Sequence, residues 1–117
     1  MKRDMDLARQ ILLQSEEKAR YGNLVVELEF EDVPKQILSE HVKLLTEAGL
    51  IESKVNTREA SLLPTRLTWQ GHEFLDAARN ENRWNQAKKT ISEKCGSLTF
   101  DVLKAVLTQL MRQSVGL

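Results

Sequence analysis

Residues 37–52 read I-L-S-E-H-V-K-L-L-T-E-A-G-L-I-E, and residues 66–75 read R-L-T-W-Q-G-H-E-F-L. In the first stretch, apolar residues recur at helical spacing up to Gly49, a residue type that commonly ends helices by adopting a positive φ. Leu50-Ile51 follows at once and starts a strand. The second stretch predicts a strand that enters another helix at Thr68 or Gln70. The sequence therefore predicts a helix, two strands and a helix in this order.

The two predicted strands, 50–55 and 62–69, form a hairpin around the polar segment 56–61. This segment contains no glycine, so the sequence does not specify the turn type. Pro64 is predicted to lie at a sheet edge, because proline cannot donate to a ladder of backbone hydrogen bonds.

The segments on either side of residues 37–75 predict further helices and one further strand. Residues 4–20 predict an amphipathic helix with Asp4 as its N-cap, and Gly22 is expected to end it with a positive φ. Residues 24–30 alternate apolar and acidic side chains, which is typical of a half-buried strand. Asp32 and Pro34 are expected to open the helix that ends at Gly49. Two more helices are predicted, at 80–95 and from Ser97 or Thr99 to about residue 113.

Length and composition indicate one soluble domain. The chain has 117 residues, of which 41% are hydrophobic and 29% charged. We expect a single domain over 1–117, with a core at about 4–78 and a C-terminal helical extension at 80–113. No apolar run approaches the ~20 residues that span a bilayer, so no membrane association is expected. The start has no secretory signal and Cys95 is the sole cysteine, which favours a cytoplasmic location.

The charge balance argues against a strongly nucleic-acid-binding protein. Seventeen Lys and Arg residues face seventeen Asp and Glu residues, a net charge of zero. Segment 23–32 holds four acids and no base. Dedicated nucleic-acid binders usually carry a basic excess or a basic face, so any attraction to DNA must come from local asymmetry.

The motifs L-L-T-E-A-G-L-I and L-T-W-Q-G-H-E-F-L, within residues 33–78, resemble those of winged helix-turn-helix regulators of the MarR and PadR kind. Over nearly the whole chain, the sequence is similar to a family of uncharacterised bacterial and prophage proteins, a domain of unknown function. The matching stretches are Met1–Leu7, His41–Ile51, Leu67–Arg79 and Trp84-Asn85. This resemblance implies a mainly α, α+β fold of winged-helix type with a small antiparallel sheet. It supplies no function.

If a protein of this fold binds DNA, the contacts are expected on one specific face. The residues that would contact DNA lie on the helix ending at Gly49 and on the hairpin: Lys35, Gln36, Ser39, Lys43, Lys54, Arg58 and Arg66. Gln36 and Ser39 would contact base edges and the cations would contact phosphates. The alternative is an ordinary solvated helix face, which neutral charge favours. About sixteen residues between the acidic strand and Gly49 fit one helix better than the two of a helix-turn-helix, unless a break near Leu38-Ser39 creates a short first helix.

The last predicted helix carries a wide apolar stripe. Its members are Val102, Leu103, Val106, Leu107, Leu110 and Met111. They predict either a homodimer interface or packing on the helix at 4–20, and we favour the homodimer.

No pattern for catalysis or for metal or cofactor binding is present. His41, His72 and Cys95 lack ligand-like spacing, which favours packed or capping histidines. There is no glycine-rich phosphate loop and no nucleophile elbow, so no enzyme and no cofactor is expected. Trp69 and Trp84 are interpreted as core or interface anchors.

Two hypotheses follow. The first is a dimeric, phage-type DNA-binding transcriptional regulator that occupies an operator in double-stranded DNA. The second is a protein-interaction module on the same scaffold, an adaptor or inhibitor that does not bind DNA. A basic stripe joining Lys43, Arg58 and Arg66 would favour the first.

Overall fold

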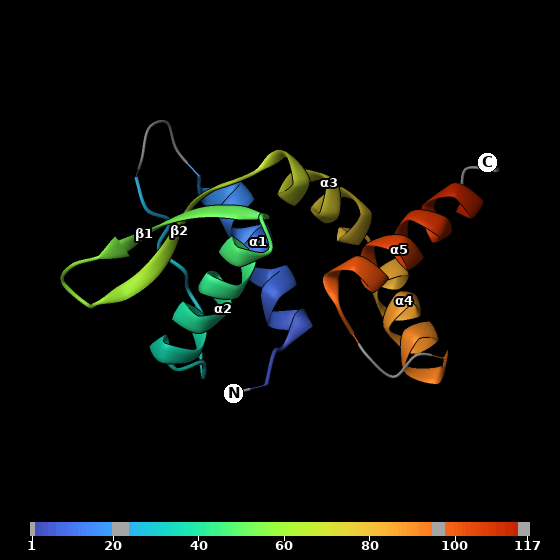
Figure 1. The fold of residues 1–117 in the computed structure, drawn as a ribbon, viewed down its shortest axis with the longest axis horizontal. Coiled ribbons are helices and arrows are strands. Elements are labelled where there is room, and N and C mark those ends of the chain that lie inside the picture. Colours follow the sequence, from blue (N-terminus) through green and yellow to red (C-terminus); the bar gives the residue numbers. More distant parts are fainter. Residues whose placement is uncertain (1, 20–23, 95–97, 115–117) are drawn as a thin grey trace. The chain divides into compact units, whose positions relative to one another are not determined.

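The structure is a computed structural model, and it describes residues 2–19, 24–94 and 98–114. Its elements are α1 (Met5–Lys18), α2 (Lys35–Glu47), β1 (Ile51–Asn56), β2 (Ser61–Leu67), α3 (Trp69–Ala78), α4 (Glu81–Lys94) and α5 (Phe100–Ser114) (Figure 1). The predicted fold class, mainly α with a small antiparallel sheet, is confirmed. Two compact units divide the chain, residues 1–72 and 73–117, and each is described by itself.

Helix α1 begins where the sequence predicts. The Asp4 carboxylate accepts hydrogen bonds from the backbone N–H groups of Asp6 and Leu7, at 3.0 and 3.1 Å. Such a cap satisfies amides that have no partner within the helix. One face of α1 is buried along most of the helix, through Ile11 and Leu12 among others, and Ala19 just beyond the helix is half-buried. Gly22 lies outside the described residues.

Helix α2 is one continuous helix, without a break at Leu38-Ser39, and residues 24–34 contain no helix. Pro34 is the N-cap, whereas Asp32 lies earlier, in a turn with φ +60°. At the other end, Leu50 N–H donates to Leu45 O and Gly49 N–H donates to Thr46 O. With Gly49 at φ +78°, this is the Schellman ending that the sequence predicts.

The buried face of α2 is narrow. His41, Val42 and Leu45 are buried, and Ile37, Leu38 and Leu44 are half-buried. Ala48 is exposed. It is the C-cap residue at αR geometry, so it already belongs to the turn that leads out of the helix.

The hairpin forms close to its predicted bounds. Strands β1 and β2 pair antiparallel, with Ile51 opposite Leu67 and Asn56 opposite Ser61, and a register shift occurs between Glu52 and Ser53. Helix α2 packs on both strands, while α1 packs on β2 and on α2. The turn contains Ala60 at φ +51°, a left-handed conformation that a non-glycine residue adopts at a cost. The hairpin, called the wing below, extends beyond α2 (Figure 1).

A tight junction joins the end of α2 to the start of α3. Thr68 donates its backbone N–H to Leu50 O at 3.0 Å and its hydroxyl to Gly49 O. Its Oγ1 also accepts from Gly71 N–H at 3.0 Å, so Thr68 caps α3. Gly71 lies so close to Leu50 that a Cβ at this position would stand 1.9 Å from the Leu50 carbonyl oxygen. The two sequence motifs, one containing Gly49-Leu50 and the other containing Thr68 and Gly71, thus meet in one contact.

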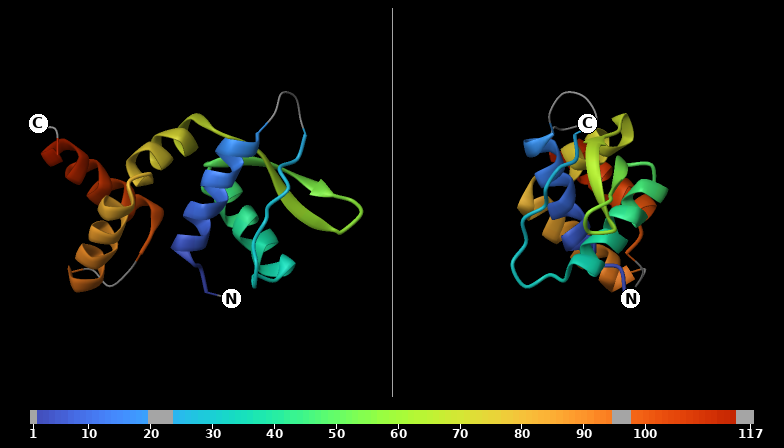
Figure 2. Two further views of the ribbon diagram at one scale, coloured as in Figure 1. Left: turned by 180° about the vertical axis from the view of Figure 1, so that it is seen from behind. Right: turned by 90° about the vertical axis from the view of Figure 1, so that its left-hand side faces the viewer.

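The strand predicted at 24–30 is wrong: the sheet has two strands, and this segment is an extended trace without regular structure (Figure 2). Val26 N–H donates to Pro64 O at 2.7 Å, so the segment does reach β2. The ladder cannot continue there, because Pro64 has no N–H and Leu62 N–H is already bound by Ser39 Oγ. In place of a partner strand, the side-chain amide of Gln14 holds the segment. It donates to the C=O of Glu29 at 2.8 Å and accepts from the N–H of Glu29 at 2.9 Å.

The second unit contains the end of α3 together with α4 and α5. Phe74 makes edge-to-face contacts with Trp84 and Phe100, with ring centroids 6.4 and 5.3 Å apart. Helix α4 is capped by Asn80, whose Oδ1 accepts from Arg83 N–H. Helix α5 begins at Phe100, and Thr99 Oγ1 accepts from Val102 N–H, as one of the two predicted caps requires. Cys95 and Ser97 lie outside the described residues.

Candidate interaction surface

The outward face of α2 presents only part of the predicted DNA-contacting set. Lys35, Gln36 and Lys43 are exposed. Ser39 is half-buried, and its Oγ accepts the Leu62 N–H at 3.0 Å. That bond fixes α2 against the outer edge of β2, so Ser39 has a structural task rather than a free hydroxyl for a base edge.

Two of the predicted cations are held by carboxylates. Lys35 Nζ lies 2.9 Å from Glu59 Oε1. Arg66 binds Glu52 through two parallel contacts, Nε to Oε2 and Nη2 to Oε1, both at 3.1 Å, and donates Nη1–H to Leu67 O at 2.7 Å. Exposed ion pairs of this kind add little stability. They do, however, cancel the local positive potential that phosphate binding needs.

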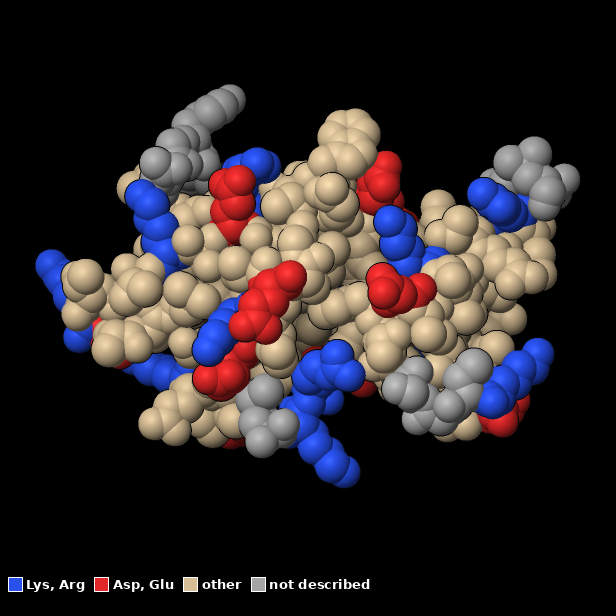
Figure 3. All heavy atoms as spheres, viewed as in Figure 1, with Lys and Arg blue, Asp and Glu red and all other residues tan. Residues whose placement is uncertain are grey.

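Three predicted cations remain unpaired within the described residues: Lys43, Lys54 and Arg58 all have exposed side chains. Glu40 and Glu47 are exposed on the same helix as Lys43. On the face shown in Figure 3, blue side chains are interrupted by red and tan ones, and no continuous basic stripe crosses the view. By sequence, residues 1–72 carry ten Lys and Arg against twelve Asp and Glu, a net charge of −2.

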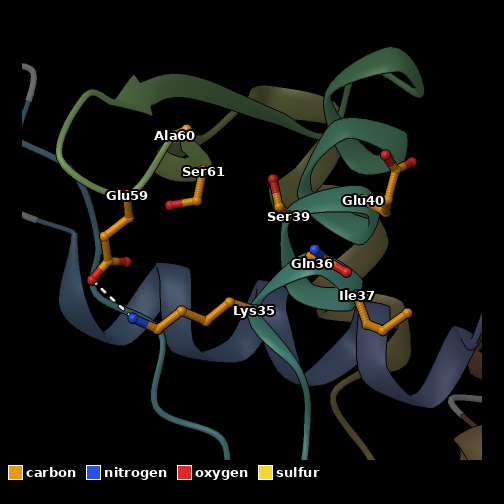
Figure 4. A pocket seen from close by; sticks show the side chains of 8 residues that line it. All are labelled: Lys35, Gln36, Ile37, Ser39, Glu40, Glu59, Ala60 and Ser61. Carbon is orange, nitrogen blue, oxygen red and sulfur yellow. Dashed lines mark hydrogen bonds and ion pairs between the residues drawn. The ribbon is translucent and has the colours of Figure 1, made fainter.

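A groove lies between the first half of α2 and the turn of the wing. Its volume is about 410 Å³, and its lining is Lys35, Gln36, Ile37, Ser39, Glu40, Glu59, Ala60 and Ser61 (Figure 4). The Lys35–Glu59 ion pair spans one side of it. The Ser61 Oγ is buried without a hydrogen-bond partner among the described residues. With two carboxylates and one ammonium in its wall, the groove is better suited to a polar or cationic group than to phosphate.

The histidines occupy structural positions. His41 is 2% exposed, and its two ring nitrogens bond the backbone of Asp4, which precedes α1, and of Ile37 in α2. Asp4 N–H donates to Nε2 at 2.9 Å, so Nε2 carries no proton, and Nδ1 donates to Ile37 O at 2.8 Å. His72 is exposed and lies 3.7 Å from Glu16. In the part of the chain that the structure describes, no group of three His, Cys, Asp or Glu is arranged to hold a metal ion.

The sequence left open whether Trp69 and Trp84 are core residues or interface residues, and the two differ in the structure. Trp84 is buried at 2% exposure and belongs to the core of the second unit. Trp69 is 74% exposed, at the first position of α3 directly after Thr68. A signal for this was present in the sequence: at 100° per residue, Trp69 lies opposite the stripe formed by Gly71, Phe74, Leu75 and Ala78.

The predicted dimer residues divide between core and surface. Leu103 and Leu107 are fully buried, and α5 packs against α4. The other four, Val102, Val106, Leu110 and Met111, are half-buried. Among the described residues, no helix is long and apolar enough to cross a membrane.

Comparison with known proteins defines the family. The family described as "Hypothetical protein (DUF2513)" matches residues 2–97, and the chain belongs to it. An uncharacterised protein of Haemophilus influenzae is 40% identical over 115 residues, which cover 97% of this chain and 98% of that protein. No solved structure matches the chain. The family and this relative carry no assigned activity, so function has to be argued from the surface.

Proposed function

We propose that the protein is a protein-interaction module, in which the helix-and-wing unit of residues 1–72 binds another protein without performing chemistry. The observation that carries this proposal is Trp69, which is 74% exposed on a backbone fixed by the Thr68 and Gly71 contacts. Tryptophan is among the residues most enriched at the energetic centres of protein interfaces. An aromatic side chain of this size with three quarters of its surface in solvent offers a large apolar area to a partner.

The charges around α2 and the wing support the same proposal. Lys35 and Arg66 are neutralised by Glu59 and Glu52, and the unit as a whole is acidic. A surface of alternating charge with one large aromatic anchor is typical of a protein interface with a polar rim. A duplex-binding face instead concentrates positive charge on one side.

A second candidate, the DNA-binding transcriptional regulator, is favoured by a different observation. Lys43, Lys54 and Arg58 have no ion pair within the described residues, and they lie on the helix and wing that a winged-helix regulator would apply to DNA. Three phosphate contacts would give a slope of about −3 in a plot of log affinity against log salt.

One pair of measurements decides between the candidates. The first is fluorescence anisotropy of labelled random-sequence duplex DNA with the full chain across a salt series. We expect no binding at ~50 mM salt, where three phosphate contacts would still be effective. The second is nuclease-treated affinity capture from bacterial lysate, which we expect to retain a stoichiometric protein partner. Salt-dependent DNA binding that is lost in Lys43→Glu and Arg58→Glu, with no retained protein, would establish the regulator instead.

A further inference from the structure

We propose that the outer edge of β1 binds an extended segment of a protein partner, which adds to the wing as a third, antiparallel strand and sets an acidic side chain opposite Lys54. This inference rests on the proposed function and specifies how the partner binds. Residues 51–55 of β1 are called the β1 edge below. Strand addition takes its affinity from backbone hydrogen bonds and its specificity from the side chains along the strand.

The geometry of the ladder determines which backbone groups of β1 face outward. Leu50 O accepts from Thr68 N–H, whereas Leu62, which lies opposite Val55, turns its N–H away from β1 to a side chain of α2. In an antiparallel ladder, alternate residues direct both backbone groups to the partner strand. The even-numbered residues of β1 therefore bond β2, and Ser53 and Val55 direct their N–H and C=O groups to the outer side.

The two outer edges of the sheet differ. The edge of β2 is occupied, by Ser39 Oγ and by the N–H of Val26. Within the described residues, β2 is the only strand beside β1, and the outward backbone groups of Ser53 and Val55 have no hydrogen-bond partner (Figure 1). β1 contains no proline, and the extra residue at the register shift, Thr65, belongs to β2. Edge strands are commonly covered or interrupted by such devices, so the β1 edge is open to another strand.

The side chains of the β1 edge make it selective. Val55 is 63% exposed and offers an apolar surface on one face of the strand. Lys54 is exposed on the opposite face and has no ion pair within the described residues, whereas Glu52 is already bound by Arg66. Because directly opposed side chains on paired strands contact each other, a partner gains from an apolar residue opposite Val55 and a carboxylate opposite Lys54. A lysine or arginine opposite Lys54 is repelled.

The middle of the β1 edge is held in place before a partner binds. Thr46 Oγ1 in α2 donates to Val42 O at 2.7 Å and lies 2.9 Å from Ser53 Oγ. Since the one proton of Thr46 Oγ1 is used by Val42 O, the Ser53 hydroxyl is the donor in the second bond. This bond fixes β1 to α2, and a strand that is already ordered loses less entropy on binding.

The same bond disfavours a second copy of the chain as the occupant. Two β1 edges paired about a two-fold axis at Ser53 would set Glu52 of each copy opposite Lys54 of the other. Because α2 contacts Ser53, that register would bring together the last turns of two α2 helices, each with exposed Glu47 and no basic residue to offset the negative end of its dipole. A register shifted by one residue would oppose Lys54 to Lys54 or Glu52 to Glu52.

The test uses the full chain labelled with ¹⁵N and the capped peptide I-E-T-K-V. In antiparallel pairing, its glutamate lies opposite Lys54 and its threonine opposite Ser53. We expect the amide signals of Ser53 and Val55 to shift saturably, with a Kd of about 1 mM. At about ten times this concentration, solvent exchange at both amides slows about tenfold, because only the free form exchanges. The Lys54 amide faces β2 and is the internal control, whose exchange should not change.

Two altered peptides separate backbone pairing from charge. The peptide I-K-T-E-V has the same composition but sets a lysine opposite Lys54, and we expect it to bind about fivefold more weakly. N-methylation of the threonine in I-E-T-K-V removes the N–H that would donate to Ser53 O, and we expect no measurable binding.

Variants of the chain locate the binding. In Lys54→Glu the preference reverses, so that I-K-T-E-V binds about fivefold more tightly than I-E-T-K-V. Lys104→Glu, at an exposed position on α5, leaves the preference unchanged. Val55→Pro removes an outward N–H that β2 does not use, so peptide binding is lost while urea unfolding stays cooperative.

Four results would overturn the inference. They are the absence of a saturable shift at Ser53 and Val55, equal affinities for the two charged peptides, binding that survives N-methylation, and shifts at these amides that depend on protein concentration without peptide. The last would make a second copy the occupant. A protein partner whose capture by the full chain survives both Lys54→Glu and Val55→Pro would remove the β1 edge and leave the protein-interaction function standing. Salt-dependent DNA binding without a retained protein would remove the function itself.

Discussion

At the scale of single residues, two glycines in one junction are predicted to respond very differently to alanine. At Gly71 an added Cβ would stand 1.9 Å from the Leu50 carbonyl oxygen, which is backbone and cannot rotate away. At Gly49 there is open space within 4 Å, and only the φ of +78° opposes a side chain. We expect Gly71→Ala to lower the free energy of unfolding by about 3 kcal/mol, and Gly49→Ala by about 1 kcal/mol.

Urea unfolding of both variants, followed by circular dichroism, provides the comparison. Equal losses would show that the junction relaxes around residue 71 and that the close approach to Leu50 is not required. Thr68→Val extends the same test, because it removes the hydroxyl that links Gly49 O and Gly71 N–H while keeping the side-chain volume.

The sequence predicted that His41 is a packed or capping histidine, but it could not predict which groups the ring bonds. Its spacing indicates a packed histidine, but only the tertiary structure brings the Asp4 N–H to its Nε2. His41→Phe would leave the Asp4 N–H without its acceptor, a loss of about 1–3 kcal/mol, while the Ile37 carbonyl keeps its bond within α2. His72→Phe is the matched control at an exposed position, and we expect its effect to stay within about 0.5 kcal/mol. A small effect at both histidines would mean that water replaces the ring of His41.

At the scale of elements, local signals predicted most of the fold. The caps at Asp4 and Thr68 and the glycine at 49 are encoded within a few residues of where they act. The strand prediction for segment 24–30 was wrong because the alternation of apolar and acidic residues indicates which side chains are buried. It does not indicate which backbone groups are hydrogen-bonded. Whether a half-buried segment becomes a strand depends on free donors along its neighbour, and here Pro64 and Ser39 remove them.

The contact between Gln14 and Glu29 can be tested by substitution at residue 14. The Gln14 amide both donates to and accepts from the backbone of Glu29, and a carboxylate can only accept. We therefore expect Gln14→Glu to lose about 1 kcal/mol through the bond to the Glu29 carbonyl, while Gln14→Met removes both bonds and raises the amide exchange rate of Glu29. Exchange measured by NMR would show this directly, with Gln10→Glu, an exposed position on the same helix, as the control. Unchanged exchange at Glu29 would mean that the contact between Val26 and Pro64 alone holds the segment.

At the scale of the whole molecule, the sequence predicted candidate residues but not their electrostatic state. Lys35 and Arg66 were correctly placed on the surface, yet their carboxylate partners lie 24 and 14 residues away along the chain. Pairing over such separations is a property of the fold. The same holds for Ser39, whose hydroxyl is bound by the edge of β2. A list of exposed basic residue types therefore overestimates the positive potential that a DNA phosphate would meet.

Self-association is the remaining expectation at this scale, and α5 offers a pair of adjacent positions to test it. Val106 is half-buried and Leu107 is fully buried. If the stripe of Val102, Val106, Leu110 and Met111 joins two copies, as we propose, Val106→Lys gives a monomer whose unfolding midpoint at low concentration is unchanged. Leu107→Lys instead disrupts the core of the second unit, because a buried unpaired ammonium is strongly unfavourable. Sedimentation equilibrium of the wild type and both variants measures the masses. A monomeric wild type at micromolar concentration would contradict the proposal, since interfaces of about 800 Å² per partner normally persist there.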